Sequence, residues 1–199
     1  MFPLFESICV LDGHIQNVEY HSNRFLESYQ KFYLQFPDFN LLDNIFIPEE
    51  YRNGKIKMRI SYNQSDRKHS FQPYSAKKVE RLKVVVDNSI DYNLKFEDRS
   101  ALERLYQQKV DCDDILIVRN NAITDTYYAN IVFWNKNTWH TPKTCLLKGT
   151  KRAQLLETGR IRESSIQLGD LNDFSGFQLI NAMLEFDPYT FLPIENIKF

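Results

Sequence analysis

The sequence predicts an α+β protein, because many short strand-like segments are interrupted by only a few helical ones. The chain has 199 residues, which is enough to bury a sizeable core as one large domain or two small ones. It contains 15 Phe and 11 Tyr against 6 Gly and 7 Pro. A chain so rich in large apolar rings, and so poor in residues that break regular structure, is expected to be compact and folded.

The N-terminal segment is predicted to form a β-hairpin followed by a helix. Residues 4–10 are apolar and β-prone, residues 11–13 (Leu-Asp-Gly) indicate a turn, and residues 15–20 are expected to return as the second strand. Ser22 is expected to cap the helix that follows. Aromatic residues recur on one face of that helix and are expected to pack in the core: Phe25, Tyr29, Phe32, Tyr33 and Phe36.

The middle of the chain is predicted to be mostly β. Residues 55–62 and 81–86 are expected strands, and the polar residues 63–70 between them are expected to form a turn. Asp98 can cap a helix whose apolar residues fall on one side. Further strands are predicted at residues 114–118, 123–124 and 129–134, with a turn at Asn120-Asn121.

The C-terminal part is predicted to hold a third helix and the last strands. Thr150 can cap the helix, and Gly159 is placed to end it in a left-handed conformation. Strands are expected at residues 165–168 and 177–183. A change in composition near residues 88–94 places a domain boundary there. We therefore expect a small N-terminal α+β domain at residues 1–90 and a larger C-terminal domain at residues 91–199.

Composition excludes several classes of protein. The 25 Lys and Arg nearly balance the 26 Asp and Glu, so charge gives no reason to expect nucleic acid or an anionic membrane as a partner. No apolar run approaches the roughly 20 residues that span a bilayer, and the N-terminus lacks the features of a signal peptide. Cys9, Cys112 and Cys145 share no metal-ligand spacing with the histidines. We expect a cytoplasmic protein with reduced thiols and no metal.

Two local features could carry acid–base chemistry. Lys95 lies between apolar Leu94 and Phe96, just before a predicted helix. Desolvation there could lower its pKa and make it a nucleophile, whereas an ordinary exposed lysine is the alternative. Asp125 lies in a polar bend between two apolar strands and could hold a cation or a protonated ring nitrogen, with Asn130 as a neighbouring donor. The alternative is that these residues only build a turn.

Two further features could bind a phosphate group. Gly149 leads into a helix at Thr150, where free backbone N–H groups and the helix dipole would favour an anion, and Lys151 adds positive charge. Arg24, at the head of the aromatic helix, could bind a phosphate with two parallel hydrogen bonds. A glycine before a helix and a surface arginine are common, so each feature has an ordinary structural alternative.

The order of these features resembles the class IV aminotransferase family, the fold-type IV pyridoxal-phosphate enzymes. The stretch FESICVLDG…HSNRF resembles the family's "FET…G…H..RL", and DDILIVRNNAITDTYYANIVFW…WHTP resembles its "DEAL…G.VTE…SNIF…TP". LLKGTKRAQLLE is similar to "LLPGITR..LLE", and LINAM to the closing "cNAL" segment. The resemblance covers most of the chain. It implies a shortened two-domain α+β architecture of the D-amino-acid aminotransferase type and a homodimer.

The resemblance also implies a role for each candidate residue. Lys95 corresponds to the catalytic lysine, which bonds to the aldehyde of pyridoxal 5'-phosphate and carries the substrate proton. Asp125 stands where the family has the glutamate that pairs with the pyridinium nitrogen. The implied cofactor-binding set is completed by Arg24, Asn130, Gly149, Thr150, Lys151 and Asn181.

Departures from the family pattern favour one activity over another. The "TRG" strand end, whose arginine recognises a substrate carboxylate in D-amino-acid aminotransferases, corresponds to Ser61-Tyr62-Asn63. A transaminase binds two acids in turn and needs that arginine. A 4-amino-4-deoxychorismate lyase performs one elimination on a compact diacid, which Arg59, Lys57 or Tyr62 could help to hold. We therefore expect a lyase that forms 4-aminobenzoate and pyruvate. The alternatives are a branched-chain or D-amino-acid aminotransferase of the same fold and a non-catalytic cofactor-binding homologue.

Overall fold

The computed structural model describes all 199 residues, and these divide into two compact units. Unit 1 comprises residues 1–76 and 94–98, and unit 2 comprises residues 77–93 and 99–199. The predicted single division between residues 90 and 91 differs from this arrangement. The short segment 94–98 belongs to unit 1 because Phe5 N donates a hydrogen bond to Lys95 O (3.0 Å) and Leu4 forms a β-bridge with Phe96.

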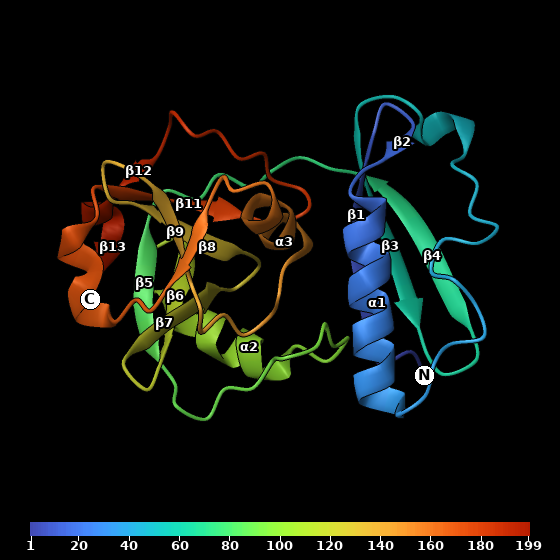
Figure 1. Cartoon of the computed structure of the whole chain (residues 1–199), viewed down its shortest axis with the longest axis horizontal. Coiled ribbons are helices and arrows are strands. Elements are labelled where there is room, and N and C mark those ends of the chain that lie inside the picture. Colours follow the sequence, from blue (N-terminus) through green and yellow to red (C-terminus); the bar gives the residue numbers. More distant parts are fainter. The chain divides into compact units, whose positions relative to one another are not determined.

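Unit 1 is a four-stranded sheet with one helix packed along one face (Figure 1). The strand order is β2-β1-β3-β4, and every pair is antiparallel. The strands are β1 (Leu4–Leu11), β2 (His14–Ile15), β3 (Lys55–Tyr62) and β4 (Arg67–Pro73), and the helix is α1 (Val18–Tyr33). Their apolar faces form a core that includes Leu4, Ile8, Phe25, Tyr29 and Tyr62.

Local expectations for unit 1 were partly wrong. The predicted second strand ends at Ile15, because Asn17 adopts a left-handed conformation (φ 54°) that starts α1. Ser22 therefore lies inside the helix and does not cap it. The aromatic face is buried at Phe25 and Tyr29, as predicted, but Phe32 and Phe36 are 41% and 68% exposed. Phe36 lies beyond the end of α1.

Unit 2 contains two sheets that share one apolar core. One sheet has the order β10-β9-β8-β11-β12 and the other β13-β5-β6-β7, and their inward side chains, such as Leu116, Val118, Ile131, Phe133 and Phe177, form a single cluster. The strands of this unit are β5 (Leu82–Val86), β6 (Asp114–Arg119), β7 (Ala122–Thr126), β8 (Asn130–Trp134), β9 (Trp139–Pro142), β10 (Arg162–Ser164), β11 (Gly176–Ile180), β12 (Leu192–Pro193) and β13 (Ile197–Lys198).

Two helices complete unit 2, α2 (Ser100–Tyr106) and α3 (Thr150–Glu157). Their caps differ from expectation, because the N-cap positions are occupied by Arg99 and Gly149, one residue away from the predicted Asp98 and Thr150. Gly159 follows α3 with φ 68°, as predicted. The strand predicted at residues 165–168 is wrong, because β10 ends at Ser164 and Gln167 instead begins a 3₁₀ turn closed by a capping box.

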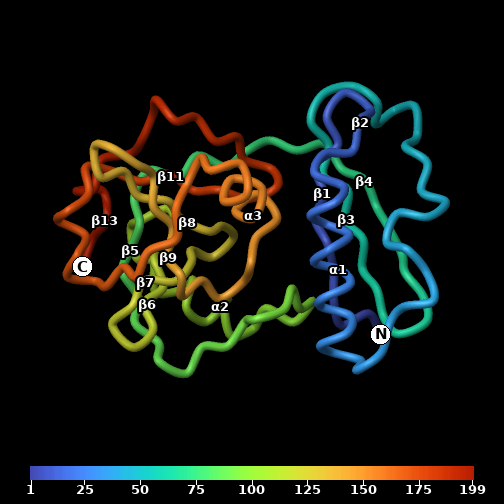
Figure 2. The backbone as a smooth tube through the Cα atoms, viewed as in Figure 1, coloured from blue at the N-terminus to red at the C-terminus, as the bar shows by residue number.

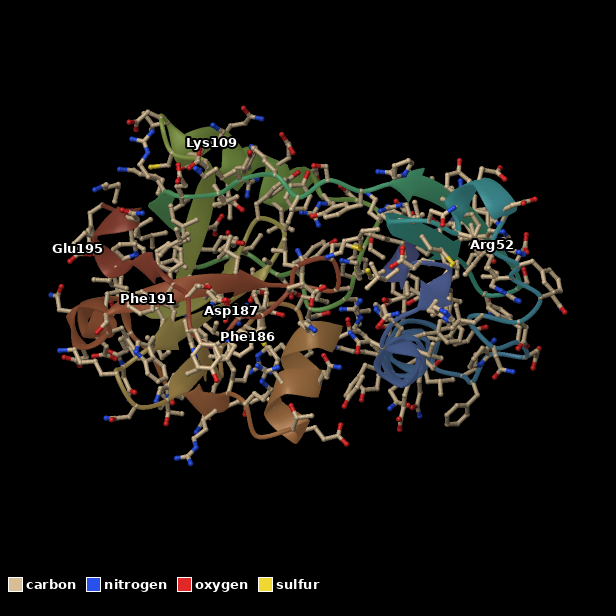
Figure 3. The ribbon with its side chains drawn as sticks, turned by 90° about the horizontal axis from the view of Figure 1, so that it is seen from above. Arg52, Lys109, Phe186, Asp187, Phe191 and Glu195 are labelled. Atoms are coloured by element: carbon tan, nitrogen blue, oxygen red, sulfur yellow. The ribbon has the colours of Figure 1, made fainter.

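The chain path explains how the units are assembled from the sequence. The tube in Figure 2 leaves β4, continues to β5 of unit 2, returns to β1 with residues 94–98 and then enters α2. The segment after β11 carries Phe186 and Phe191, both labelled in Figure 3, and the Phe191 ring lies against Gly176 of β11. Phe186 packs edge-on against Trp139, with ring centroids 5.4 Å apart. No helix of the structure has the length and apolar character needed to cross a membrane.

Candidate functional site

Lys95 is carried by a short extended segment attached to β1 of unit 1. Besides the bond from Phe5 N to Lys95 O, Glu97 N donates to Pro3 O (2.8 Å), so the backbone is fixed on both sides of Phe96. The Lys95 side chain is half-buried, and its Nζ lies 4.7 Å from the centroid of the Phe5 ring. This lysine is thus held by an aromatic ring and a sheet edge, not by a mobile charged loop.

Arg24 makes two hydrogen bonds to a carboxylate that lies completely inside unit 1. Its Nε donates to Glu6 Oε1 (2.8 Å) and its Nη2 to Glu6 Oε2 (2.5 Å). His21 lies one turn earlier on α1, and its Nδ1 is 2.7 Å from Glu6 Oε2. The Glu6 and His21 side chains are both fully buried, whereas that of Arg24 is 11% exposed. Glu6 on β1 therefore fixes the guanidinium of Arg24, which lies in the second turn of α1.

The charges of this cluster follow from its burial and its partners. Burial alone raises the pKa of Glu6, but the charge of Arg24 and the hydrogen bond from His21 outweigh burial and lower it to about 2. Burial lowers the pKa of His21 and outweighs the opposing effect of Glu6. Near pH 7 the carboxylate is ionised and the imidazole is neutral, so the proton between them resides on His21 Nδ1. The cluster thus pairs one cation with one anion.

Asp125 forms the centre of a second buried cluster, in unit 2. Asn130 Nδ2 donates to Asp125 Oδ1 (2.7 Å), and Leu147 N donates to Asp125 Oδ2 (2.9 Å). Asn130 Nδ2 also donates to Leu147 O (2.9 Å), which closes the network. Strands β7 and β8 supply the two side chains, and the segment before α3 supplies the backbone groups. The proposed partnership of Asp125 and Asn130 is present in this network.

The donors to Asp125 are uncharged amides, and this decides its protonation. Burial raises the pKa of Asp125 to about 6, against the opposing effects of the Leu147 and Asn130 hydrogen bonds and the more distant Arg152 charge. A buried carboxylate with such neighbours is poised to accept a proton or to pair with a cation. The donors to Asp125 include no cation. A protonated ring nitrogen, which offers both a positive charge and an N–H donor, would complement this carboxylate.

Gly149 is required by the same network. A Cβ at this position would collide with Asn130 Oδ1 and come within 3.2 Å of Asn130 Cγ. The glycine therefore lets the backbone at the start of α3 approach the Asn130 amide. Its φ of −68° is ordinary, so close approach and not backbone conformation explains the residue. Close packing against Asn130 is therefore a structural reason for Gly149, and its predicted contact with a phosphate stays a prediction.

The remaining predicted residues lie nearby in unit 2 with different surroundings. Thr150 is the buried first residue of α3. Lys151 Nζ donates to Gln154 Oε1 (3.1 Å), so this side chain lies along its own helix. Asn181 follows β11, and its Oδ1 accepts from Met183 N (2.8 Å) and Leu184 N (3.1 Å), which makes it a turn-forming residue. Its Nδ2 donates to Tyr128 O (3.3 Å), close in sequence to Asn130.

The structure thus groups the candidates by unit. Lys95 and Arg24 belong to unit 1, and the other predicted residues belong to unit 2. Sequence reasoning missed Glu6, which forms the centre of the unit 1 cluster. Glu6 is a single charged residue in the apolar strand LFESICVL, and His21 and Arg24 are spaced three apart on one helical face. That combination could have suggested an inward carboxylate facing two basic groups.

Comparisons with known proteins agree with this fold. The family model for amino-transferase class IV matches residues 3–190. An uncharacterized protein of Haemophilus influenzae is 36% identical over 185 residues, which is 92% of this chain and 98% of that protein. A crystal structure from Haemophilus somnus, provisionally named a 4-amino-4-deoxychorismate lyase, is 39% identical, with a TM-score of 0.86 over 92% of this chain and 97% of that one.

A more distant structure shares the fold alone. A hypothetical aminotransferase of Mycobacterium tuberculosis, solved in a pyridoxal-phosphate-bound form, is 16% identical, with a TM-score of 0.68 over 91% of this chain and 78% of that one. The family match spans nearly the whole chain, and the relatives of higher identity are matched over almost their full length. This chain belongs to the amino-transferase class IV family and has the fold-type IV architecture of that family.

Proposed function

We propose that this protein is a pyridoxal-phosphate-dependent lyase that converts 4-amino-4-deoxychorismate into 4-aminobenzoate and pyruvate. Its family consists of pyridoxal-phosphate enzymes, and a structure 39% identical to it carries the provisional lyase name. Lys95 is the proposed catalytic residue. Arg24, Asp125, Asn130, Gly149, Thr150, Lys151 and Asn181 are the proposed cofactor-binding residues.

The placement of Tyr62 is the observation that favours a lyase over a transaminase. Tyr62 occupies the position at which D-amino-acid aminotransferases have the arginine for a substrate carboxylate. Its side chain is completely buried in the core of unit 1 beneath α1, where its ring lies 4.9 Å from that of Phe25. A residue so placed cannot bind the carboxylates of two successive amino and keto acids. A single elimination on one substrate does not require that exchange.

The cofactor would supply an electron sink that stabilises a carbanion, and each cluster of the protein supports it in a different way. Asp125, ionised when a protonated ring nitrogen faces it, would hold that proton in place. The Glu6 carboxylate fixes Arg24 in one orientation, in which the guanidinium would bind a phosphate. Lys95, supported by Phe5 and the sheet edge, would hold the transferred proton at its Nζ.

A product assay tests the proposal. The purified protein, incubated with 4-amino-4-deoxychorismate, is expected to release 4-aminobenzoate and pyruvate in equal amounts, and Lys95→Ala should abolish both products. The matched control is Lys31→Ala, which removes an exposed lysine from the last turn of α1. Transfer of the amino group to 2-oxoglutarate, without release of pyruvate, would replace the lyase by the aminotransferase alternative.

Cofactor binding is tested separately from turnover. The wild-type protein is expected to show the visible absorbance of bound pyridoxal phosphate, and Lys95→Ala should lose that band. A bound cofactor with neither product would favour the non-catalytic homologue. The expected homodimer is part of this proposal and can be checked by sedimentation of the purified protein.

A further inference from the structure

A pocket of about 590 Å³ lies on unit 1, and the proposed function assigns it no role. It is lined by Met1 and Phe2, by Arg59, Ser61, Lys68, His69 and Ser70 of β3 and β4, and by Glu97. Glu6 points toward α1, so its neighbours on β1, Phe5 and Ser7, face the other side of the sheet. Arg59 and Ser61 pair with Ser7 and Phe5 and thus share that side.

The pocket already contains the Glu97 carboxylate, and each of its two oxygens accepts a hydrogen bond. Arg59 Nη2 donates to Glu97 Oε2 (2.5 Å), and Ser61 Oγ donates to Glu97 Oε1. A guanidinium and a hydroxyl that each take one oxygen of the same carboxylate form a recognition arrangement for that group. Glu97 comes from the segment that carries Lys95, so this arrangement lies two residues from the proposed catalytic lysine.

The Glu97 side chain can leave without dislodging its segment. Its backbone N remains bonded to Pro3 O, and the Leu4–Phe96 bridge and the Phe5–Lys95 hydrogen bond are independent of the carboxylate. The Arg59 and Glu97 side chains are 33% and 32% exposed, and ion pairs at such positions contribute little net stability. Exchange of one carboxylate for another leaves the charge beside Arg59 unchanged.

The rest of the pocket lining indicates what kind of molecule would carry the bound carboxylate. Lys68 adds a second positive charge, and its Nζ lies 5.1 Å from the centroid of the Phe2 ring. Met1 and Phe2 supply an apolar wall beside the polar groups. The lining therefore suits a compact ring that bears a carboxylate. Of the three residues considered for holding a diacid, Arg59 lines this pocket, whereas Lys57 and Tyr62 do not.

We propose that this pocket is a carboxylate subsite in which Arg59 and Ser61 bind the ring carboxylate of the substrate or product in place of Glu97. The inference rests on the proposed function for the identity of the acid. Glu97 then acts as an internal competitor that occupies the subsite until a ligand arrives. Removal of the Glu97 charge should therefore strengthen the binding of an external carboxylate. A purely structural ion pair between Arg59 and Glu97 would not have this effect.

Binding of 4-aminobenzoate to the cofactor-loaded protein, followed by calorimetry without turnover, tests the subsite. Glu97→Gln is expected to tighten binding by about three- to tenfold, and Arg59→Gln to weaken it by about tenfold or more. Lys31→Gln removes an exposed charge from α1, on the other side of the sheet, and should change affinity less than about twofold. The neutral amide 4-aminobenzamide should bind the wild type at least about tenfold more weakly than the acid.

Three results would each overturn the subsite. The first is an affinity for 4-aminobenzoate that is unchanged or reduced in Glu97→Gln, the second is equal binding of the acid and the amide, and the third is no saturable binding to the wild type. A gain in affinity cannot arise from a damaged fold, so Glu97→Gln remains informative if Arg59→Gln is unstable. Because no product is measured, loss of the lyase assignment would leave this binding result intact. Conversely, a failed subsite would leave the product assay unchanged.

Discussion

Each of the two units buries a carboxylate, yet the pKa values of the two groups shift in opposite directions. Glu6 in unit 1 has a pKa lowered to about 2, and Asp125 in unit 2 has a pKa raised to about 6. Burial raises the pKa in both places, so the neighbours decide the outcome. Glu6 faces the Arg24 guanidinium and a His21 N–H, whereas the hydrogen-bond donors to Asp125 are uncharged amides, among them those of Asn130 and Leu147.

The difference separates two roles for buried carboxylates. The Glu6 charge is balanced within the protein, so its function is to orient Arg24. The hydrogen-bond donors to Asp125 carry no charge, which supports the proposed pairing of this carboxylate with a ring cation of the cofactor. The same contrast predicts opposite responses to mutation and to pH in the cofactor-free protein.

Glu6→Gln should have the largest effect. The substitution keeps the shape of the side chain but leaves the nearly buried Arg24 without its anion, and breaking a buried ion pair in this way costs about 3–5 kcal/mol. Chemical denaturation of the cofactor-free protein at pH 7 measures the loss. Glu19→Gln, on the exposed side of α1, is the control and should change the unfolding free energy by less than about 0.5 kcal/mol. A loss below about 1 kcal/mol in Glu6→Gln would mean that Arg24 does not depend on Glu6.

Asp125→Asn should reveal the opposite pH dependence. Because the folded pKa of Asp125 is raised from 3.8 to about 6, its stabilising contribution is complete below pH 4 and is lost as the pH rises through 6. The unfolding free energy of the variant, relative to wild type, should therefore rise by about 3 kcal/mol between pH 3.5 and 7. Denaturation series at several pH values, without cofactor, measure this difference.

Denaturation of Glu6→Gln over the same pH range should show the contrasting dependence. The pKa of Glu6 is lowered from 4.5, so its contribution is complete above pH 4.5 and is lost as the pH falls toward 2. The penalty of Glu6→Gln should accordingly shrink as the pH falls from 4.5 toward 2. The relative gain of Asp125→Asn should also shrink on acidification, but earlier, as the pH falls through 6 toward 4. Parallel pH profiles for the two variants would contradict the contrast between the clusters. Bound cofactor should reduce the Asp125→Asn effect, because a ring cation would stabilise the ionised carboxylate.

Gly149→Ala tests how tightly the Asp125 network is packed. The added Cβ meets Asn130 Oδ1, so the amide must move and its bonds to Asp125 and Leu147 O must lengthen. Overpacking of this kind costs about 1–3 kcal/mol. Gly169→Ala is the matched control, because a Cβ there meets nothing within 4 Å. Equal thermal stability of the two variants would show that the network can absorb a methyl group.

Part of the order of the elements could be predicted from the sequence, because it depends on local patterns. Alternating apolar residues marked β3 and β5, and the glycine at position 159 marked the end of α3. The turn predicted at residues 63–70 is wrong in its second half, because β4 (Arg67–Pro73) begins there and pairs with β3. The predicted start of α1 is wrong, because Asn17 and not Ser22 occupies the N-cap position, in a left-handed conformation and without a side-chain capping bond. The attachment of residues 94–98 to unit 1 was also hidden, since the β-bridge joins Leu4 to Phe96 across about ninety residues of sequence.

The candidate site shows the same limit. Asp125 and Asn130 are five residues apart, so a polar bend between two strands was enough to suggest their partnership. Glu6 and Arg24 are brought together by packing of α1 on β1, and no local pattern at residue 24 discloses the carboxylate. Gly149 was identified for a phosphate, but its contact with Asn130 depends on a distance between β8 and the segment before α3.

His21→Asn should have the smallest effect, and it separates the contribution of His21 to stabilising Glu6 from that of Arg24. An asparagine amide can replace the Nδ1–H donor, so the cost at pH 8 should be about 1 kcal/mol while Arg24 still holds Glu6. The pKa of His21 is lowered from 6.5 by burial, so its stabilising contribution is complete above pH 6.5 and is lost as the pH falls. The variant should therefore approach or exceed wild-type stability near pH 5.5, as measured by denaturation at both pH values. If the cost instead grows on acidification, His21 is protonated in the folded protein, and the buried Glu6 carboxylate is stabilised by two cations instead of one.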